Sequence, residues 1–346
     1  MQAGVRSLRR QMCRSFALLL FGAIALACNK SKNASPSSEA QTTQSPAQNT
    51  PSLTAEPSGP ATHVDPARAW KYLKDIVAIG PRWDGSKGQE RIGQYLHNKL
   101  KSEQVEEDTF VADTPAGKIP MRNIIAKFPG TKDGIIVLGT HIDTNYPLRH
   151  TSYVGANDGG SSTALLLAIA DQLRGKKLEG YSVWLAFLDG EEAIQEWTDT
   201  DSIYGSRHLA AKWQADGTMS HLKAFILADM IGDKDLDIRR DESSTWWLED
   251  LVLRAATRLG YQSHFFATSS PVGDDHTPFA AAGVPVADLI DFDYGYGNAF
   301  WHTPEDTIDK LSPASLQISG DVILETIRLL NANADRLPAA SAKKAP

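Results

Sequence analysis

The chain has 346 residues, of which 42% are hydrophobic and 22% are charged, with a formal net charge of −7. This composition is sufficient to build a substantial buried core. A moderately acidic chain without basic clusters is a poor partner for nucleic acid, so we expect no nucleic-acid ligand.

Residues 1–27 have the features of a secretory signal. Four arginines precede an apolar run over residues 16–27, and this run is too short to span a bilayer as a mature helix. Cys28 directly follows small residues, which resembles a bacterial lipoprotein signal, in which the cysteine is lipidated and becomes the new amino terminus. Ala25 is also compatible with ordinary signal cleavage, so lipidation and simple cleavage both remain open.

The signal predicts an exported protein, either periplasmic or on the cell surface. Its contact with a membrane would be a lipid on Cys28, at the outer membrane if the organism is Gram-negative. The only other cysteine is Cys13, which lies inside the signal. The mature chain therefore cannot form an internal disulfide.

Three segments follow the signal. Residues 28–62 are rich in Ser, Thr, Pro, Ala and Gln without hydrophobic periodicity, which predicts a disordered tether. Residues 63–336 have the length of one large folded domain, and residues 337–346 form a tail of small residues and lysine that we expect to be flexible.

Helices and strands alternate along the predicted domain. Helices are expected from Asp65, around Ile92 to Leu100, over 161–173 and 248–259, and from Ser312 to about Arg336; strands are expected near 109–111, 121–128, 134–139, 181–188, 224–227 and 284–290. This alternation predicts an α/β fold. Its single domain would have a central mixed, largely parallel sheet with helices on both faces.

Acidic and histidine residues follow several of the predicted strands. The candidates are His141, Asp143, Asp158, Glu191, Glu192, Asp229, Asp274, Asp275, His276 and His302. Open α/β sheets place their sites at the carboxyl ends of the strands. Because imidazole nitrogen and carboxylate oxygen are zinc ligands, the pattern predicts a zinc site at this edge.

These residues stand in motifs that resemble the zinc aminopeptidase family M28. The motifs are HID at 141–143, GANDGGSS at 155–162, FLDGEE at 187–192, ADMIG at 228–232 and WHTPEDT at 301–307. The resemblance implies one zinc on Asp158, Glu192 and His302, a second on His141 and Asp229 with Asp158 as the bridge, and Glu191 as the general base.

Further segments resemble the animal-type glutaminyl cyclases, which share this fold and usually hold one zinc. They are DGEEA at 189–193, Trp197, residues 201–212, VGDDHTPF at 272–279 and the pair 301–302. The resemblance implies zinc-dependent cyclisation of the N-terminal glutamine of a peptide or protein to pyroglutamate, with release of ammonia.

The same resemblance implies roles for single residues around the zinc ligands. Glu191 would move the proton, while Asp274 and Asp229 would form a hydrogen-bonded pair that supports the reacting amine. At the substrate pocket, Trp197 and Trp301 would form walls and His276 would orient the loop rather than bind metal.

Two departures keep alternatives open. The turn at 155–162 is more similar to the aminopeptidases, and Gly297 replaces an aromatic residue that lines the cyclase pocket, with Tyr294 and Tyr296 nearby. The rival enzyme is a two-zinc aminopeptidase that releases N-terminal amino acids, since all five ligands are present. The third hypothesis is a lipid-anchored binding protein with the same fold. It would require the loss of a metal ligand or of the general base, and none of these residues is missing.

Overall fold

A computed structural model describes residues 52–338. The predicted signal, Cys28, most of the predicted tether and most of the predicted tail lie outside the described residues. In the described part, no helix combines the length and the apolar character needed to cross a membrane.

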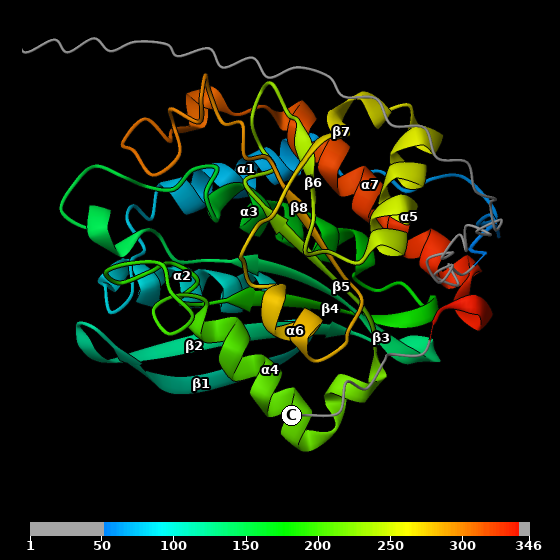
Figure 1. The fold of residues 1–346 in the computed structure, drawn as a ribbon, viewed down its shortest axis with the longest axis horizontal. Coiled ribbons are helices and arrows are strands. Elements are labelled where there is room, and N and C mark those ends of the chain that lie inside the picture. Colours follow the sequence, from blue (N-terminus) through cyan, green and yellow to red (C-terminus); the bar gives the residue numbers. More distant parts are fainter. Residues whose placement is uncertain (1–51, 339–346) are drawn as a thin grey trace, which may run out of the picture. The chain divides into compact units, whose positions relative to one another are not determined.

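A six-stranded mixed sheet forms the centre of the domain (Figure 1). Its order is β1 (Gln104–Thr114), β2 (Gly117–Phe128), β4 (Leu178–Leu188), β3 (Gly130–His141), β5 (Leu222–Asp229) and β8 (Val286–Ile290). β1 and β2 form an antiparallel hairpin and β2 pairs antiparallel with β4, whereas β4, β3, β5 and β8 are parallel. The predicted mixed, largely parallel sheet is confirmed.

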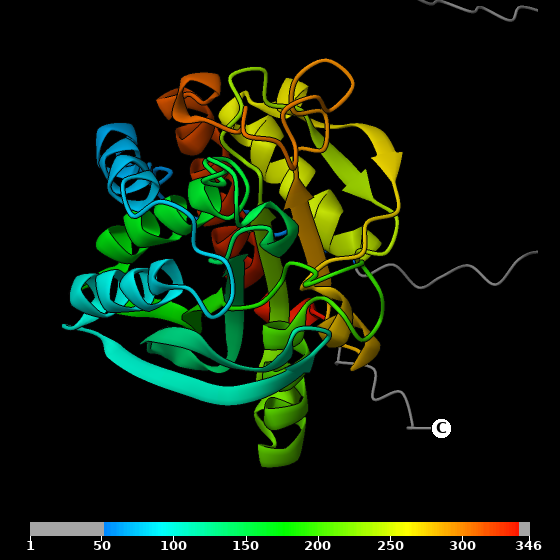
Figure 2. The same cartoon turned by 90° about the vertical axis from the view of Figure 1, so that its left-hand side faces the viewer.

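Helices cover both faces of this sheet (Figures 1 and 2). One face carries α1 (Pro66–Val77), α2 (Lys87–Leu100), α3 (Gly160–Leu173), α5 (Trp246–Leu259) and α7 (Pro313–Ala332); the other carries α4 (Tyr204–Asp216) and α6 (Thr277–Ala281). Beside the main sheet, β6 (Ile238–Asp241) pairs parallel with β7 (Phe265–Ser270).

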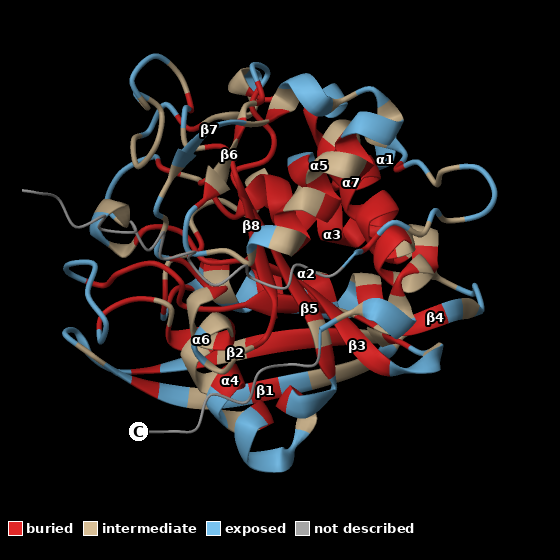
Figure 3. Cartoon of the chain, turned by 45° about the vertical axis from the view of Figure 1, so that its right-hand side comes forward, coloured by how far each residue is buried: buried red, intermediate tan, exposed pale blue. Residues whose placement is uncertain are grey.

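The central strands are buried on both faces, as Figure 3 shows for β3, β5 and β8. Successive side chains of a strand point to opposite faces, so each strand contributes to two cores. In β3, Ile136 and Leu138 pack into the core under α1 and α3, whereas Val137 packs into the core under α4 and α6. Such strands are near-continuous apolar runs, which is why the sequence pattern locates them.

Side-chain caps fix the helix starts that the sequence predicts. The Asp65 carboxylate accepts from the amides of residues 67 and 68, and the Ser312 hydroxyl accepts from those of residues 314 and 315. The last helix ends at Ala332 rather than near Arg336, because a short 3-10 turn replaces its final residues.

The folded domain starts before residue 63, where the sequence places the end of the tether. Leu53 is buried in the core, and the Ala55 amide donates to Asn333 Oδ1 over 2.9 Å. Arg254 of α5 contacts the Glu56 carboxylate. Arg254 of α5 and Asn333, which follows the end of α7, therefore bind residues 53–56 of the predicted tether, although this segment has no regular structure.

Candidate active site

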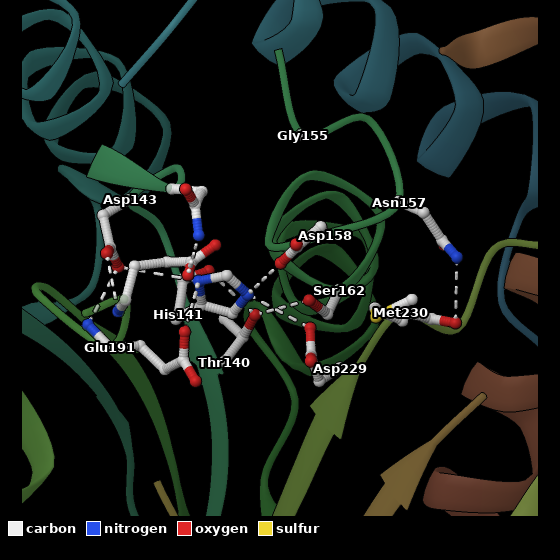
Figure 4. A network of polar contacts seen from close by, with 12 residues as sticks. Thr140, His141, Asp143, Gly155, Asn157, Asp158, Ser162, Glu191, Asp229 and Met230 are labelled. Atoms are coloured by element: carbon white, nitrogen blue, oxygen red, sulfur yellow. Dashed lines mark hydrogen bonds and ion pairs between the residues drawn. The ribbon is translucent and has the colours of Figure 1, made fainter. Parts of the chain in front are cut away.

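Side chains from the carboxyl ends of three parallel strands converge at one edge of the sheet (Figure 4). His141 is the last residue of β3, Asp229 is the last of β5, and Glu191 and Glu192 follow β4. Asp158 joins them from the turn that precedes α3. The sequence prediction that these residues share one edge agrees with this placement.

His141, Asp158 and Asp229 form what we call the inner group. His141 Nε2 lies 3.1 Å from Asp158 Oδ1 and 3.1 Å from Asp229 Oδ1. Figure 4 shows the imidazole between the two carboxylates. All three residues are buried, and their ligand atoms are close enough together to hold one metal ion.

Asp158, Glu192 and His302 form what we call the outer group. His302 Nε2 lies 3.3 Å from Asp158 Oδ2 and 3.2 Å from Glu192 Oε1. Asp158 thus belongs to both groups and turns one oxygen toward each. This is the arrangement of a carboxylate that can bridge two metal sites, and the outer group is also able to hold an ion.

A cavity of about 750 Å³ opens onto the outer group. Its lining includes the whole outer group together with Glu191, Asp229 and Asp274, while Trp197 and Trp301 form parts of its wall. His141 does not line it. A substrate in this cavity would meet the outer group and Glu191 directly.

The Glu191 carboxyl is buried among other acids, and its pKa is raised. Burial raises its pKa well above the usual value, and the charges of Asp274 and Glu192 raise it further against the opposing charge of His141. The pKa of Asp274 is raised in the same way, by burial and then by the charge of Asp229. Carboxyl groups whose pKa is raised in this way are concentrated at functional sites.

Buried carboxylates anchor the loops that carry these residues. Asp143 accepts hydrogen bonds from the amides of Glu191 (3.1 Å) and Glu192 (3.0 Å). Asp306 accepts from the amide of Asp158 (3.2 Å) and from that of the preceding residue (2.8 Å). Both loops are therefore held through hydrogen bonds to their own backbone amides, which leaves the side chains of Asp158, Glu191 and Glu192 free to face the site.

Unusual backbone angles also shape the site. His302 has a φ of 50°, a left-handed conformation that is uncommon for a residue with a side chain. Gly190 has a φ of 70°, and a Cβ at this position would lie 2.5 Å from Met121 Sδ. The glycine before Glu191 is therefore required for the sharp turn that follows β4.

Three polar residues that lie at the site are not identified from the sequence. Asn145 Nδ2 donates to Glu192 Oε2 over 2.8 Å, and the Tyr153 hydroxyl donates to Asp158 Oδ2 over 2.6 Å. Arg82 is fully buried and donates to backbone carbonyls of the flanking loops. None of the three is an acid or a histidine at a strand end, so the pattern used for the ligands gives no signal for them.

The two predicted tryptophans lie at the cavity. Trp301 stacks on the His302 ring with centroids 4.1 Å apart, and Trp197 stands at the rim with 44% of its surface exposed. Of the two tyrosines near Gly297, Tyr294 is buried against Asp306 and Tyr296 is fully exposed. Neither replaces the missing pocket aromatic.

Two expectations for the loop after β7 need correction. His276 is fully buried, does not line the cavity, and its Nε2 lies 3.1 Å from Asp241 Oδ2, so it is not part of the substrate pocket wall; its expected role in orienting the loop stays a prediction. The chain enters α6 at His276, and this directs the ring toward β6 instead. The predicted hydrogen bond between Asp274 and Asp229 is not formed: Asp229 contacts His141, and Asp274 Oδ1 accepts from the next amide.

Comparison with known proteins identifies the family of this chain. The model of peptidase family M28 matches residues 123–327. A glutaminyl-peptide cyclotransferase-like protein from Mus musculus is 31% identical over 283 residues, covering 73% of each chain. A crystal structure of an Acidobacteriales bacterium glutaminyl cyclase is 50% identical, with a TM-score of 0.76, over 83% of this chain and 98% of that one.

A Zn-dependent exopeptidase from Parabacteroides distasonis has a similar fold, with a TM-score of 0.70 and 26% identity over 78% of this chain and 99% of that one. The family match covers more than half of the sequence and includes every residue of both groups. The chain therefore belongs to peptidase family M28.

Proposed function

We propose that this member of peptidase family M28 is a zinc-dependent glutaminyl-peptide cyclotransferase. It would cyclise the N-terminal glutamine of a peptide or protein to pyroglutamate and release ammonia. The observation that carries the proposal is one cavity in which Glu191, Asp274 and the outer group meet between two tryptophans. The similarity to named glutaminyl cyclases supports the same activity.

The donor set of the outer group fits zinc, which prefers imidazole nitrogen and carboxylate oxygen. Glu192 Oε1 is buried, has no hydrogen-bond partner within residues 52–338 and lies 3.2 Å from His302 Nε2, as a carboxylate oxygen that binds a cation would. A zinc ion held by Asp158, Glu192 and His302 would polarise the γ-amide of the substrate as a Lewis acid.

The protein then needs to supply proton transfer and orientation. The substrate's own α-amine attacks the carbonyl carbon (Cδ) of its γ-carboxamide, a carbon–nitrogen bond forms, and the bond from that carbon to the amide nitrogen breaks. Glu191 takes the proton from the amine and returns it to the leaving ammonia, so protons balance. Asp274 and Asp229 lie on the cavity wall, where they can accept hydrogen bonds from the amine. Trp197 and Trp301 would enclose the flat glutamine side chain.

We propose one zinc ion, in the outer group. The second candidate function, a two-zinc aminopeptidase, is favoured by one observation: the inner group is complete and Asp158 has an oxygen directed to each group. In that enzyme Glu191 would activate a water molecule rather than an amine. The low exposure of His141, 2% for its side chain, argues for a closed inner group.

For location, we propose an exported protein anchored by a lipid on Cys28, in the periplasm or at the cell surface. The support is the order of basic residues, short apolar run and small residues before Cys28. Mass spectrometry of the mature amino terminus from cells would test this. An unmodified terminus at residue 28 or beyond would contradict the anchor.

The decisive experiment incubates the purified zinc-loaded chain with a peptide that begins with glutamine. Mass spectrometry distinguishes the outcomes: loss of ammonia with an intact chain supports the cyclase, whereas a peptide shortened by one residue supports the aminopeptidase. Metal analysis in the same sample counts the zinc ions. Two tightly held zinc ions per chain together with free amino acid would refute the cyclase.

Glu191→Gln is the matched inactive variant for this experiment. The amide keeps the size of the side chain but cannot accept the proton, so we expect turnover to fall by about 10²–10⁴-fold. Zinc content should not change, because Glu191 is outside the outer group. A fully active variant would show that the base is assigned to the wrong residue.

A further inference from the structure

Asp241, at the end of β6, is a buried carboxylate surrounded by hydrogen-bond donors. Its Oδ1 accepts from the amides of Ser243 and Val272, each over 3.0 Å. Its Oδ2 accepts from the hydroxyls of Ser243 and Ser244, each over 2.7 Å, and lies 3.1 Å from His276 Nε2. Five donors therefore meet on one side chain.

Two of these donors flank Asp274 in the sequence. Val272 lies two residues before Asp274, and His276 lies two residues after it. The single proton of the Ser243 hydroxyl goes to Asp241 Oδ2, so its oxygen accepts from His276 Nε2, 2.8 Å away, and links the imidazole to the same carboxylate. The short loop that presents Asp274 to the cavity is thus held at both ends by the same residue of β6.

His276 is enclosed on its other side by a second carboxylate. Its Nδ1 lies 3.7 Å from Asp288 Oδ2. Asp288 is fully buried on β8, and neither of its carboxylate oxygens has a hydrogen-bond partner among the described residues. Burial raises the pKa of Asp288 well above its usual value, and the charge of Asp274 raises it further. The imidazole is therefore fixed between β6 and β8, and Asp288 and Asp274 influence each other.

Asp241, His276 and Asp288 also have the residue types of a metal site, and their ligand atoms lie close together. A carboxylate has about four lone-pair positions, and five donors already point at Asp241. No oxygen of this residue is left for a cation. The cluster is consequently a hydrogen-bonded support rather than a third metal group.

We propose that Asp241 and His276 are positioning residues that hold Asp274 at the wall of the cavity. Neither lines the cavity, so each would act through Asp274 rather than on the substrate. The inference rests on the proposed function, in which Asp274 supports the reacting amine. A displacement of about 1 Å in such a residue costs on the order of 10²-fold in rate.

A matched pair of variants tests which contact matters. Glutamine at position 276 can place an N–H donor close to that of Nε2 and reach Asp241, whereas asparagine is shorter and can imitate only Nδ1. We expect His276→Asn to lower kcat on a glutamine-initiated peptide by about 10–10²-fold with little change in KM. His276→Gln should retain most of the activity. The reverse ranking would overturn the proposal.

A double-mutant cycle with Asp274→Asn separates positioning from general damage. If His276 acts through Asp274, the double variant should be no slower than Asp274→Asn alone. Multiplication of the two losses would mean that His276 has an independent structural effect, and the proposal would fail. His63→Gln is the control, because His63 forms a comparable pair with Asp321 (2.7 Å) on α7. It should leave kcat unchanged.

Amide hydrogen exchange gives a readout that does not depend on activity. In the zinc-loaded chain, His276→Asn should speed exchange of residues 272–277 by about tenfold or more, while His63→Gln and wild type remain alike. An unchanged exchange rate in this loop would refute the proposal that Asp241 and His276 hold Asp274 in place. If the wild-type chain does not cyclise glutamine but exchange of residues 272–277 is faster only in His276→Asn, the proposed function fails. The proposal that His276 holds this loop then still stands.

Discussion

The inner and outer groups each contain one histidine and two carboxylates and share Asp158, yet they differ in access to solvent. Histidine–carboxylate distances are 3.1 Å in the inner group and 3.2–3.3 Å in the outer group. The His141 side chain is 2% exposed, whereas that of His302 is 28% exposed and faces the cavity. Donor geometry alone therefore does not decide which group does chemistry.

The surroundings of the two histidines explain the difference. His141 Nδ1 faces Asp143 at 3.5 Å and Glu191 at 3.8 Å, so acids surround the ring on both sides. His302 lies instead against Trp301 and an open cavity. A catalytic metal site needs a coordination position that a substrate can reach. The outer group meets this condition, which is why we propose the zinc there; in that proposal the inner group is a hydrogen-bonded support for Asp158 and Asp229.

The largest effect should come from the outer group. His302→Ala removes the only imidazole of that group, so we expect zinc to be lost and kcat/KM to fall by about 10³-fold or more. Zinc titration and cyclisation assays on the same preparation measure both effects. If His302→Ala still bound zinc tightly and turned over substrate, the outer group would not be the catalytic one.

A smaller effect should come from the inner group. His141→Ala should leave zinc content near that of wild type and lower activity by about 10–10²-fold, because a residue beside a ligand is lost rather than a ligand. Metal analysis is again the measurement. Loss of one of two zinc ions in this variant would show that both groups are occupied and would favour the aminopeptidase.

The sequence locates the strands, and places the candidate ligands at one edge of the sheet, because both depend on local signals. β3, β4 and β5 are apolar runs that end in charged residues, so His141, Glu192 and Asp229 can be placed at one edge without coordinates. The prediction fails where a side chain gains its role from a distant segment. Asp241 lies 31 residues before Val272, whose amide donates to it, and nothing in either segment indicates the contact.

The elements that sequence reasoning missed follow the same rule. α4, α6, β6 and β7 are short or have mixed composition, and tertiary contacts rather than periodicity define them. His276 illustrates the consequence: its motif resembles a pocket residue, but the turn into α6 buries the ring against β6. Asn145 was missed because an amide that orients Glu192 has no pattern of its own.

The smallest effect concerns a buried carboxyl at the same edge but outside both groups. Asp291 directly follows β8, is 1% exposed, and accepts from the amides of Asp237 (3.0 Å) and Asp293 (3.1 Å). Burial raises its pKa to about 7, against the effect of those hydrogen bonds. An unfolded aspartate has a pKa of about 3.9, so the folded chain binds more protons between these values.

Stability should therefore fall as the pH rises through this window, opposite to the usual behaviour of a salt-bridged acid. Between pH 6 and 8, ionisation of Asp291 should cost the metal-free chain about 1 kcal/mol, or a few degrees in Tm. Asp291→Asn keeps one acceptor oxygen but cannot ionise. Calorimetry at the two pH values should show a flatter Tm profile for the variant than for wild type. Parallel profiles would mean that burial at this edge does not raise the carboxyl's pKa, and the same argument for Glu191 would lose its support.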